Sequence, residues 1–186
     1  MKDHNHNPWT ILSSDIKYDN PWIKVYEHKV INPSGGQGIY GVVSPKNYAI
    51  GIVPLDEAYN TWLVGQFRFS IDQYSWEIPE GGGPKDEDPL DSAKRELLEE
   101  TGIKAGKWQK IMHGYTSNSI LDEMGIIFVA QELSFGEAAP TETELLEVKK
   151  LPFSEVVEMA LRGEITDVLA LAGIFKVQMM INRGLI

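Results

Sequence analysis

The spacing of hydrophobic and polar residues divides the chain into predicted strands. Between residues 22 and 30 two sets of side chains alternate, which is typical of a strand. A turn at residues 32–36, Asn-Pro-Ser-Gly-Gly, leads into a second strand at 38–43, so 9–43 is predicted to form an antiparallel ribbon. The nearly continuous apolar run at 48–55 predicts a strand covered on both faces. Further extended segments are predicted at 61–69, 76–79, 107–112, 125–133 and 145–151.

Three other segments have helical periodicity and suitable end residues. The first is predicted over 89–101, with Asp88 as N-cap, Pro89 in the first position and Gly102 after the end. The other two helices are predicted over 155–162, with Ser154 as N-cap and Gly163 after the end, and over 167–183, with Thr166 as N-cap and Gly184 after the end. Strands with helices between and after them predict an α/β fold in which helices cover both faces of a mixed sheet.

Length and composition are those of a folded protein with one main domain. The 186 residues are predicted to form a flexible tail (1–8), an N-terminal β ribbon (9–47) and a main domain (48–186). The net charge of −10 speaks against binding to nucleic acid, which requires clustered cations. No segment has 18 consecutive apolar residues, so no membrane span is expected. The absence of cysteine and the polar N-terminus lead us to expect a cytoplasmic protein.

The first predicted helix carries a cluster of acidic residues. Glu96, Glu99 and Glu100 are spaced at i, i+3 and i+4, so they share one face, away from the apolar positions of the helix. Like charges at this spacing cost about 0.2–0.5 kcal/mol per pair, and they lie near the helix end that disfavours anions. The cluster is either a solvated acidic face or a set of oxygen ligands for Mg²⁺ or Mn²⁺.

The residues around this helix favour the metal interpretation. Upstream, residues 80–84, Glu-Gly-Gly-Gly-Pro, are expected to form a loop whose backbone can approach a ligand closely. From Gly81 the chain has Glu87 after five residues, then Arg95-Glu96-Leu97 after seven more, and then Glu99-Glu100 and Gly102-Ile103. This pattern agrees with all nine specified positions of the Nudix box, G-x5-E-x7-R-E-U-x-E-E-x-G-U, in which U is aliphatic. Over these 23 residues the chain therefore resembles the Nudix hydrolase family.

The resemblance implies a fold, a reaction and a metal site. Nudix hydrolases form an α/β/α sandwich and use Mg²⁺ or Mn²⁺ to hydrolyse a nucleoside diphosphate linked to another group. It further implies that Glu96, Glu99 and Glu100 bind the metal, together with the main-chain carbonyl of Glu80, and that Arg95 orients the glutamates. Divalent ions would neutralise the pyrophosphate beside these carboxylates and activate water.

Other segments resemble the ADP-ribose and nucleotide-sugar pyrophosphatase branch of this family. They imply that Arg68 contacts substrate phosphates and that Glu77 and Glu123 belong to the substrate site. A general base is expected at Glu144 or, second, at Glu142. The ribbon resembles one that is exchanged across a two-fold homodimer in this branch, where Trp22 and Trp9 would stack on the base, in their own subunit or the partner. Ordinary structural or surface roles are the alternatives for Arg68, for Glu77, for the two tryptophans and for the acidic segment that contains Glu142 and Glu144.

One difference bears on specificity. ADP-ribose-specific members usually have a proline in a Ser-Pro-Gly turn where this chain has Asn118, within Ser117-Asn118-Ser119. This difference speaks against strict ADP-ribose specificity and favours a broader or different nucleotide-sugar preference, such as GDP-mannose. Two other functions remain alternatives: a non-catalytic nucleotide-sugar sensor, and a hydrolase of nucleoside triphosphates or dinucleoside polyphosphates.

Overall fold

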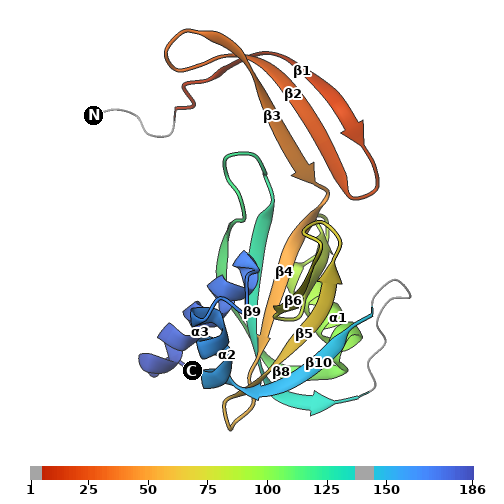
Figure 1. The fold of residues 1–186 in the computed structure, drawn as a ribbon, viewed down its shortest axis with the longest axis vertical. Helices are drawn as coiled ribbons and strands as arrows, with labels where there is room; N and C mark the ends of the chain where they lie inside the picture. Colours follow the sequence, from red (N-terminus) through yellow and green to blue (C-terminus); the bar gives the residue numbers. More distant parts are fainter. Residues whose placement is uncertain (1–5, 137–144) are drawn as a thin grey trace. The chain divides into compact units, whose positions relative to one another are not determined.

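The computed structural model describes residues 6–136 and 145–186, which form two compact units (Figure 1). The first unit contains residues 6–47 and 117–123, and the second contains residues 48–116 and 124–186 within the described ranges. The predicted ribbon ended at residue 47 and did not include the segment 117–123.

The first unit is built on three antiparallel strands in the order β1-β2-β3. The strands are β1 (Thr10–Asp19), β2 (Ile23–Ile31) and β3 (Gln37–Pro45). Asn20 fixes the β1–β2 turn, because its side-chain oxygen accepts hydrogen bonds from the backbone N–H groups of Trp22 (2.9 Å) and Ile23 (2.7 Å). Asn32 fixes the β2–β3 turn in the same way, because its side-chain oxygen accepts hydrogen bonds from the backbone N–H groups of Ser34 and Gly36.

The segment 117–123 is attached to β3 by hydrogen bonds. The N–H of Val43 donates to the carbonyl of Ile120 at 2.9 Å, and the Tyr40 hydroxyl donates to the carbonyl of Ser119 at 2.7 Å. The Ser44 hydroxyl donates to Asp122 at 2.6 Å. The turn that contains Asn118 therefore belongs to the ribbon unit.

The second unit contains two sheets. The four-stranded sheet has the order β7-β4-β9-β8, in which β4 and β9 are parallel and β8 and β9 are antiparallel. The three-stranded sheet has the order β10-β5-β6 and is antiparallel. The strands are β4 (Asn47–Pro54), β5 (Asn60–Arg68), β6 (Gln73–Glu77), β7 (Glu80–Pro84), β8 (Ile103–Tyr115), β9 (Met124–Phe135) and β10 (Glu147–Pro152).

Helices cover both faces of these sheets, with α1 (Pro89–Thr101) on one side and α2 (Phe153–Leu161) and α3 (Val168–Asn182) on the other (Figure 1). Strand residues alternate between the two cores. Ile126 and Phe128 of β9 pack in the core that contains Leu97 of α1, whereas Ile127 and Val129 pack in the core that contains α2 and α3. The predicted α/β/α sandwich is thus confirmed.

Three local predictions were wrong. The glycines after Glu80 do not form a loop, because Glu80–Pro84 is strand β7, paired with β4. Helix α2 begins at Phe153 after Pro152 and has no side-chain cap, so Ser154 is not its N-cap. Helix α3 is capped by Asp167 and not by Thr166, since the Asp167 carboxylate accepts from the N–H of Ala170 at 2.6 Å. Within the described residues, no helix is long and apolar enough to cross a membrane.

Candidate active site

The acidic helix α1 forms where the sequence predicts it, and its packing determines which face carries the glutamates. The Asp88 side chain caps its first turn by accepting from the N–H of Leu90 at 2.9 Å, and Gly102 ends it with a φ of 69°. Ala93 and Leu97 are completely buried against the sheet. This burial fixes the rotation of the helix, so that Glu96, Glu99 and Glu100 lie together along a different face.

Glu100 connects this helix to the start of β7. Glu100 is only 4% exposed, and its carboxylate accepts a hydrogen bond from the backbone N–H of Glu80 at 3.0 Å. The expected metal-ligating segments, Glu80 and the end of α1, are therefore in direct contact.

Arg95 holds the other two glutamates. Its Nη1 lies 2.8 Å from Glu96 and 3.1 Å from Glu99, while its Nη2 donates to the carbonyl of Gly82 at 3.0 Å. One guanidinium thus orients two carboxylates and ties them to β7. This geometry agrees with the orienting role that the family resemblance implies.

Gly81 allows β7 to approach α1 closely. A Cβ atom at this position would overlap the carboxylate of Glu96. Only glycine can occupy the position without displacing that side chain. The glycine of the motif is therefore explained by contact with a glutamate of the same motif.

Arg68 forms a second charged cluster with Glu77 and Glu80. Its Nε donates to both carboxylate oxygens of Glu77, at 3.0 and 3.1 Å, and its Nη2 donates to Glu77 and, at 3.0 Å, to Glu80. Glu77 is 3% exposed, so the guanidinium compensates a buried charge. Arg68 is therefore engaged by carboxylates. Its Nη1 forms no hydrogen bond or ion pair with the described residues, although the charge of Asp167 also acts on the guanidinium.

The Glu80 carboxyl group is poorly compensated. Its Oε2 is buried without a hydrogen-bond partner among the described residues. Burial, together with the nearby charges of Asp167 and Glu77, raises the pKa of Glu80 well above its usual range, although Arg68 favours the charged form. The sequence singled out Glu80 only for its carbonyl group. The sequence analysis did not place Asp167 near Glu80, because in the sequence Asp167 indicates at most the start of a helix.

The oxygen donors on α1 and β7 fit a hard divalent cation. Carboxylates and a backbone carbonyl are ligands that Mg²⁺ and Mn²⁺ prefer, and the Oε2 of Glu80 adds an uncompensated oxygen beside them. Within the described ranges, no three acidic or histidine side chains already converge as a ligand set. Arg95 holds Glu96 and Glu99 instead, so a bound cation would compete with its guanidinium.

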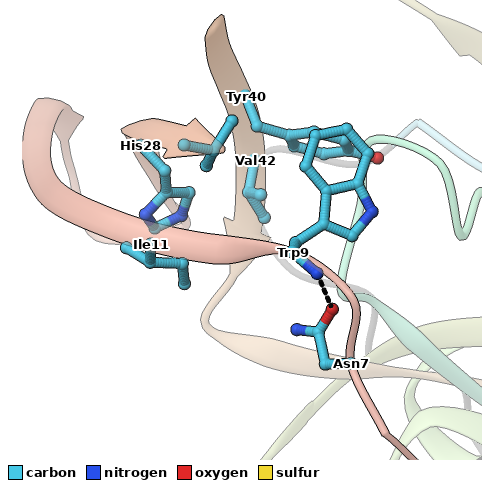
Figure 2. A pocket seen from close by; sticks show the side chains of 7 residues that line it. Asn7, Trp9, Ile11, His28, Tyr40 and Val42 are labelled. Carbon is cyan, nitrogen blue, oxygen red and sulfur yellow. Dashed lines mark hydrogen bonds between the residues drawn. The ribbon is translucent and has the colours of Figure 1, made fainter. Parts of the chain in front are cut away.

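A separate pocket of about 250 Å³ lies in the ribbon unit (Figure 2). Trp9 stands at its side with its ring edge-on to Tyr40, at a centroid distance of 5.2 Å. Val42, His28 and Ile11 line it from the three strands. An aromatic, mostly apolar pocket of this kind suits a planar group. The sequence indicated Trp9, but it did not indicate Tyr40 or His28, whose pairing depends on strand register.

The remaining predicted site residues are located as follows. Trp22 is 71% exposed in the β1–β2 turn and does not line this pocket. Glu123 is half-buried at the end of the segment 117–123 in the ribbon unit, and so is not part of the second unit. Glu142 and Glu144, the candidates for general base, lie outside the described residues.

Comparisons with known proteins agree on one family. Residues 45–171 match the family model described as the NUDIX domain, and residues 9–43 match the model described as the nucleoside diphosphate sugar hydrolase N-terminal domain. The chain is 30% identical to an ADP-ribose pyrophosphatase of Mycobacterium tuberculosis, over 95% of this chain and 85% of that protein. It is 31% identical to an ADP-ribose pyrophosphatase of Bacillus subtilis, over 85% of each chain.

Two further similarities concern specificity and fold. A GDP-mannose pyrophosphatase of Salmonella arizonae is 39% identical over 44% of each chain. The crystal structure of an ADP compounds hydrolase superposes with a TM-score of 0.84 and covers 96% of this chain and 97% of that one. At 19% sequence identity, this second similarity shows that the two proteins share a fold.

Proposed function

Because the chain belongs to the Nudix hydrolase family, we propose that it hydrolyses the pyrophosphate bond of nucleoside diphosphate sugars. The products would be a nucleoside monophosphate and a sugar phosphate. The observation that carries the proposal is the complete glutamate cluster of α1, held by Arg95 and in contact with β7. The match of residues 9–43 to the nucleoside diphosphate sugar hydrolase N-terminal domain supports this substrate class. Relatives named for ADP-ribose and GDP-mannose make both compounds the first substrates to test.

The proposed reaction assigns roles to the residues of the site. Glu96, Glu99, Glu100 and the carbonyl of Glu80 would hold Mg²⁺ or Mn²⁺, which when bound neutralises the pyrophosphate and activates water. Arg95 orients Glu96 and Glu99, and the Glu80–Glu100 hydrogen bond sets the distance between β7 and the helix. The general base is assigned to Glu144 or Glu142, which deprotonates the attacking water.

Substrate binding is assigned to Arg68 and to the tryptophans of the ribbon. Arg68 would donate to a phosphate through Nη1, because Glu77 and Glu80 engage its other side. The pocket beside Trp9 supports base stacking there. Trp22, which is far more exposed, would stack on the base from the same chain or from a second copy. Glu77 would act through Arg68, and Glu123 would contribute from the ribbon unit.

The proposal includes a homodimer formed through the ribbon. Several large apolar side chains are exposed on this unit, at Ile11, Leu12, Ile16, Tyr18 and Ile39. A small three-stranded unit with so much exposed apolar surface gains stability when a partner covers it. A cytoplasmic location stays a prediction from the sequence.

A substrate panel tests the reaction. The purified protein is incubated with Mg²⁺ and ADP-ribose, GDP-mannose, UDP-glucose, ADP-glucose, a dinucleoside polyphosphate or dGTP, and products are identified by mass. We expect a nucleoside monophosphate and a sugar phosphate from one or more of the sugars. Turnover of dGTP or the dinucleotide alone would favour the triphosphate or dinucleotide alternative. Ligand-induced stabilisation with no product from any compound would favour the sensor.

A matched pair of variants connects the reaction to the site. Glu99→Gln should lower turnover by about 100-fold or more without changing the melting temperature, because Glu99 is a proposed ligand on a helix surface. Glu57→Gln makes the same change at an exposed turn and should retain full activity. Full turnover of Glu99→Gln would contradict the metal assignment.

A further inference from the structure

The pocket beside Trp9 contains few polar groups that a ligand can reach. Its wall is mostly apolar or aromatic. The hydroxyl of Tyr40 is engaged outside the pocket, because it donates to the carbonyl of Ser119 at 2.7 Å. Figure 2 shows the indole nitrogen of Trp9 on the side of the ring that faces away from His28. Among the lining residues, the side chains of Asn7 and His28 are therefore left to form hydrogen bonds with a ligand.

The amide group of Asn7 has a fixed orientation. Its Oδ1 accepts a hydrogen bond from the backbone N–H of Trp9 at 3.0 Å, and an amide NH₂ group could not take this part because it is a donor. Figure 2 shows Oδ1 turned to the backbone of Trp9 and Nδ2 on the other side of the amide. No residue within 6–136 and 145–186 accepts a hydrogen bond from Nδ2. Asn7 therefore presents a free donor, whereas its acceptor is already engaged.

His28 does not impose a preference of its own. Its Nδ1 lies 2.8 Å from Oγ of Ser14. The Ser14 hydroxyl can donate to this nitrogen or accept from it, so Nε2 of the imidazole can serve a ligand as a donor or as an acceptor. The hydrogen-bonding preference of the pocket is therefore set by Asn7.

We propose that this pocket selects a 6-oxopurine, guanine or hypoxanthine, over adenine, and that Asn7 is the specificity-determining residue. The inference rests on the proposed function, which places the base of the nucleotide sugar beside Trp9. The pocket volume of about 250 Å³ is below the range of about 300–1,000 Å³ for complete ligand sites, so it suits a base better than a whole nucleotide.

The engaged oxygen of Asn7 is the reason for this preference. An asparagine reads adenine in two places, because Oδ1 accepts from the N6 amino group while Nδ2 donates to N7. Here the backbone of Trp9 occupies Oδ1, so the N6 amino group would face the donor Nδ2 and both would lack an acceptor. In guanine and hypoxanthine, O6 and N7 are adjacent acceptors, and both can receive hydrogen bonds from Nδ2.

Nucleoside diphosphates test the base without the reaction. GDP, IDP and ADP are titrated by calorimetry in EDTA, so that no metal supports hydrolysis. IDP has the 6-oxo group of GDP and lacks its 2-amino group, so it isolates the group that Asn7 would read. We expect GDP and IDP to bind about tenfold more tightly than ADP, which is the effect of one additional hydrogen bond. Trp9→Leu should weaken the binding of all three, because the base loses an aromatic wall.

Two asparagine variants supply the matched control. Asn7→Asp keeps an oxygen for the N–H of Trp9 and replaces the NH₂ donor by an acceptor, so the ratio of GDP affinity to ADP affinity should fall by at least about tenfold. Asn20→Asp makes the same change in a turn where the asparagine oxygen also accepts from backbone N–H groups, but outside the pocket. It should change the ratio by less than about twofold, since an added charge repels both diphosphates equally.

The outcomes separate base selection from the proposed reaction. Equal affinities for GDP and ADP, no binding at about 5 mM, binding unchanged by Trp9→Leu, or equal ratios in the two asparagine variants would overturn base selection. Hydrolysis of GDP-mannose and ADP-mannose with the same kcat/KM would also overturn it, while leaving the reaction in place. Base-selective binding with no product from any nucleotide sugar would instead overturn the proposed reaction and leave the role of Asn7 in place.

Discussion

At the scale of single residues, Gly81 leaves no room for a side chain beside Glu96. In Gly81→Ala the added methyl group overlaps the Glu96 carboxylate, which must turn away from its place beside Arg95. We expect turnover to fall by about 10–100-fold and the Mg²⁺ requirement to rise, with a folded protein. Gly114→Ala is the control, since its Cβ would make only an ordinary contact with Met112. Initial rates over a series of Mg²⁺ concentrations measure the turnover and the Mg²⁺ requirement of each variant. Equal rates for Gly81→Ala and Gly114→Ala would show that the position of Glu96 is not needed.

Arg68 carries a prediction about stability as well as binding. Arg68→Ala leaves the carboxylate of Glu77 buried without its cation, which in a fully buried pair costs about 3–5 kcal/mol. Because Arg68 is itself about one-third exposed, we expect a loss of about 1–3 kcal/mol in the free energy of unfolding. Urea denaturation measures this loss, and Glu77→Gln combined with Arg68→Ala should recover part of it. Undiminished stability of Arg68→Ala would mean that solvent already screens Glu77.

Sequence predicts some contacts of the site and cannot predict others. The glutamates of α1 are neighbours because helical geometry fixes residues three and four apart, so their clustering follows from spacing alone. The contacts of Arg68 with Glu77 and Glu80 instead depend on how β5 pairs with β6 and where β7 begins. Strand register is a property of the folded sheet, and for this reason the buried carboxyl of Glu80 was not predicted.

At the scale of elements, the turn between β4 and β5 is organised by Asp56. Its carboxylate accepts from the backbone N–H groups of Ala58 and Asn60 and pairs with Lys150 of β10 at 2.9 Å. Burial opposes its ionisation, but the hydrogen bonds from Asn60 and the charge of Lys150 outweigh it and lower the pKa of Asp56 to about 2. Asp56 therefore joins a turn and an edge strand by a charged contact.

This lowered pKa predicts a pH dependence of stability. The folded pKa lies below the value of about 3.9 expected in the unfolded chain, so the contribution is complete above about pH 4 and is lost as the pH falls through 2. Asp56→Ala should lose about 1–2 kcal/mol of unfolding free energy at pH 7, and the gap to wild type should shrink towards pH 2–3. Urea denaturation at several pH values measures it, with Glu57→Ala as the exposed control. A gap independent of pH would contradict the assignment.

Whole elements were predicted correctly where the pattern of hydrophobic and polar residues was long, and wrongly where this pattern was short. The helix 89–101 has an apolar stripe and strong caps, and its bounds agree with α1. Strand β7 consists of Glu-Gly-Gly-Gly-Pro, which has no hydrophobic alternation, so only its pairing with β4 makes it a strand. The segment 117–123 is similar, because its hydrogen bonds to β3 come from tertiary contact and leave no periodic signal in the sequence.

At the scale of the whole molecule, the exposed apolar surface of the ribbon predicts self-association. Ile39 is 69% exposed in β3, an outer strand of a unit that has little core of its own. We expect wild type to be a dimer by light scattering, and Ile39→Asp to shift it to the monomer, because a buried unpaired carboxylate disfavours the interface. Leu161→Asp makes a comparable change at the exposed end of α2, in the other unit, and should leave the dimer intact. A monomeric wild type, or equal masses for wild type and Ile39→Asp, would contradict association through this face.

If the second copy supplies Trp22, Ile39→Asp should also raise KM for the sugar substrate, and Trp22→Ala should raise KM while remaining a dimer.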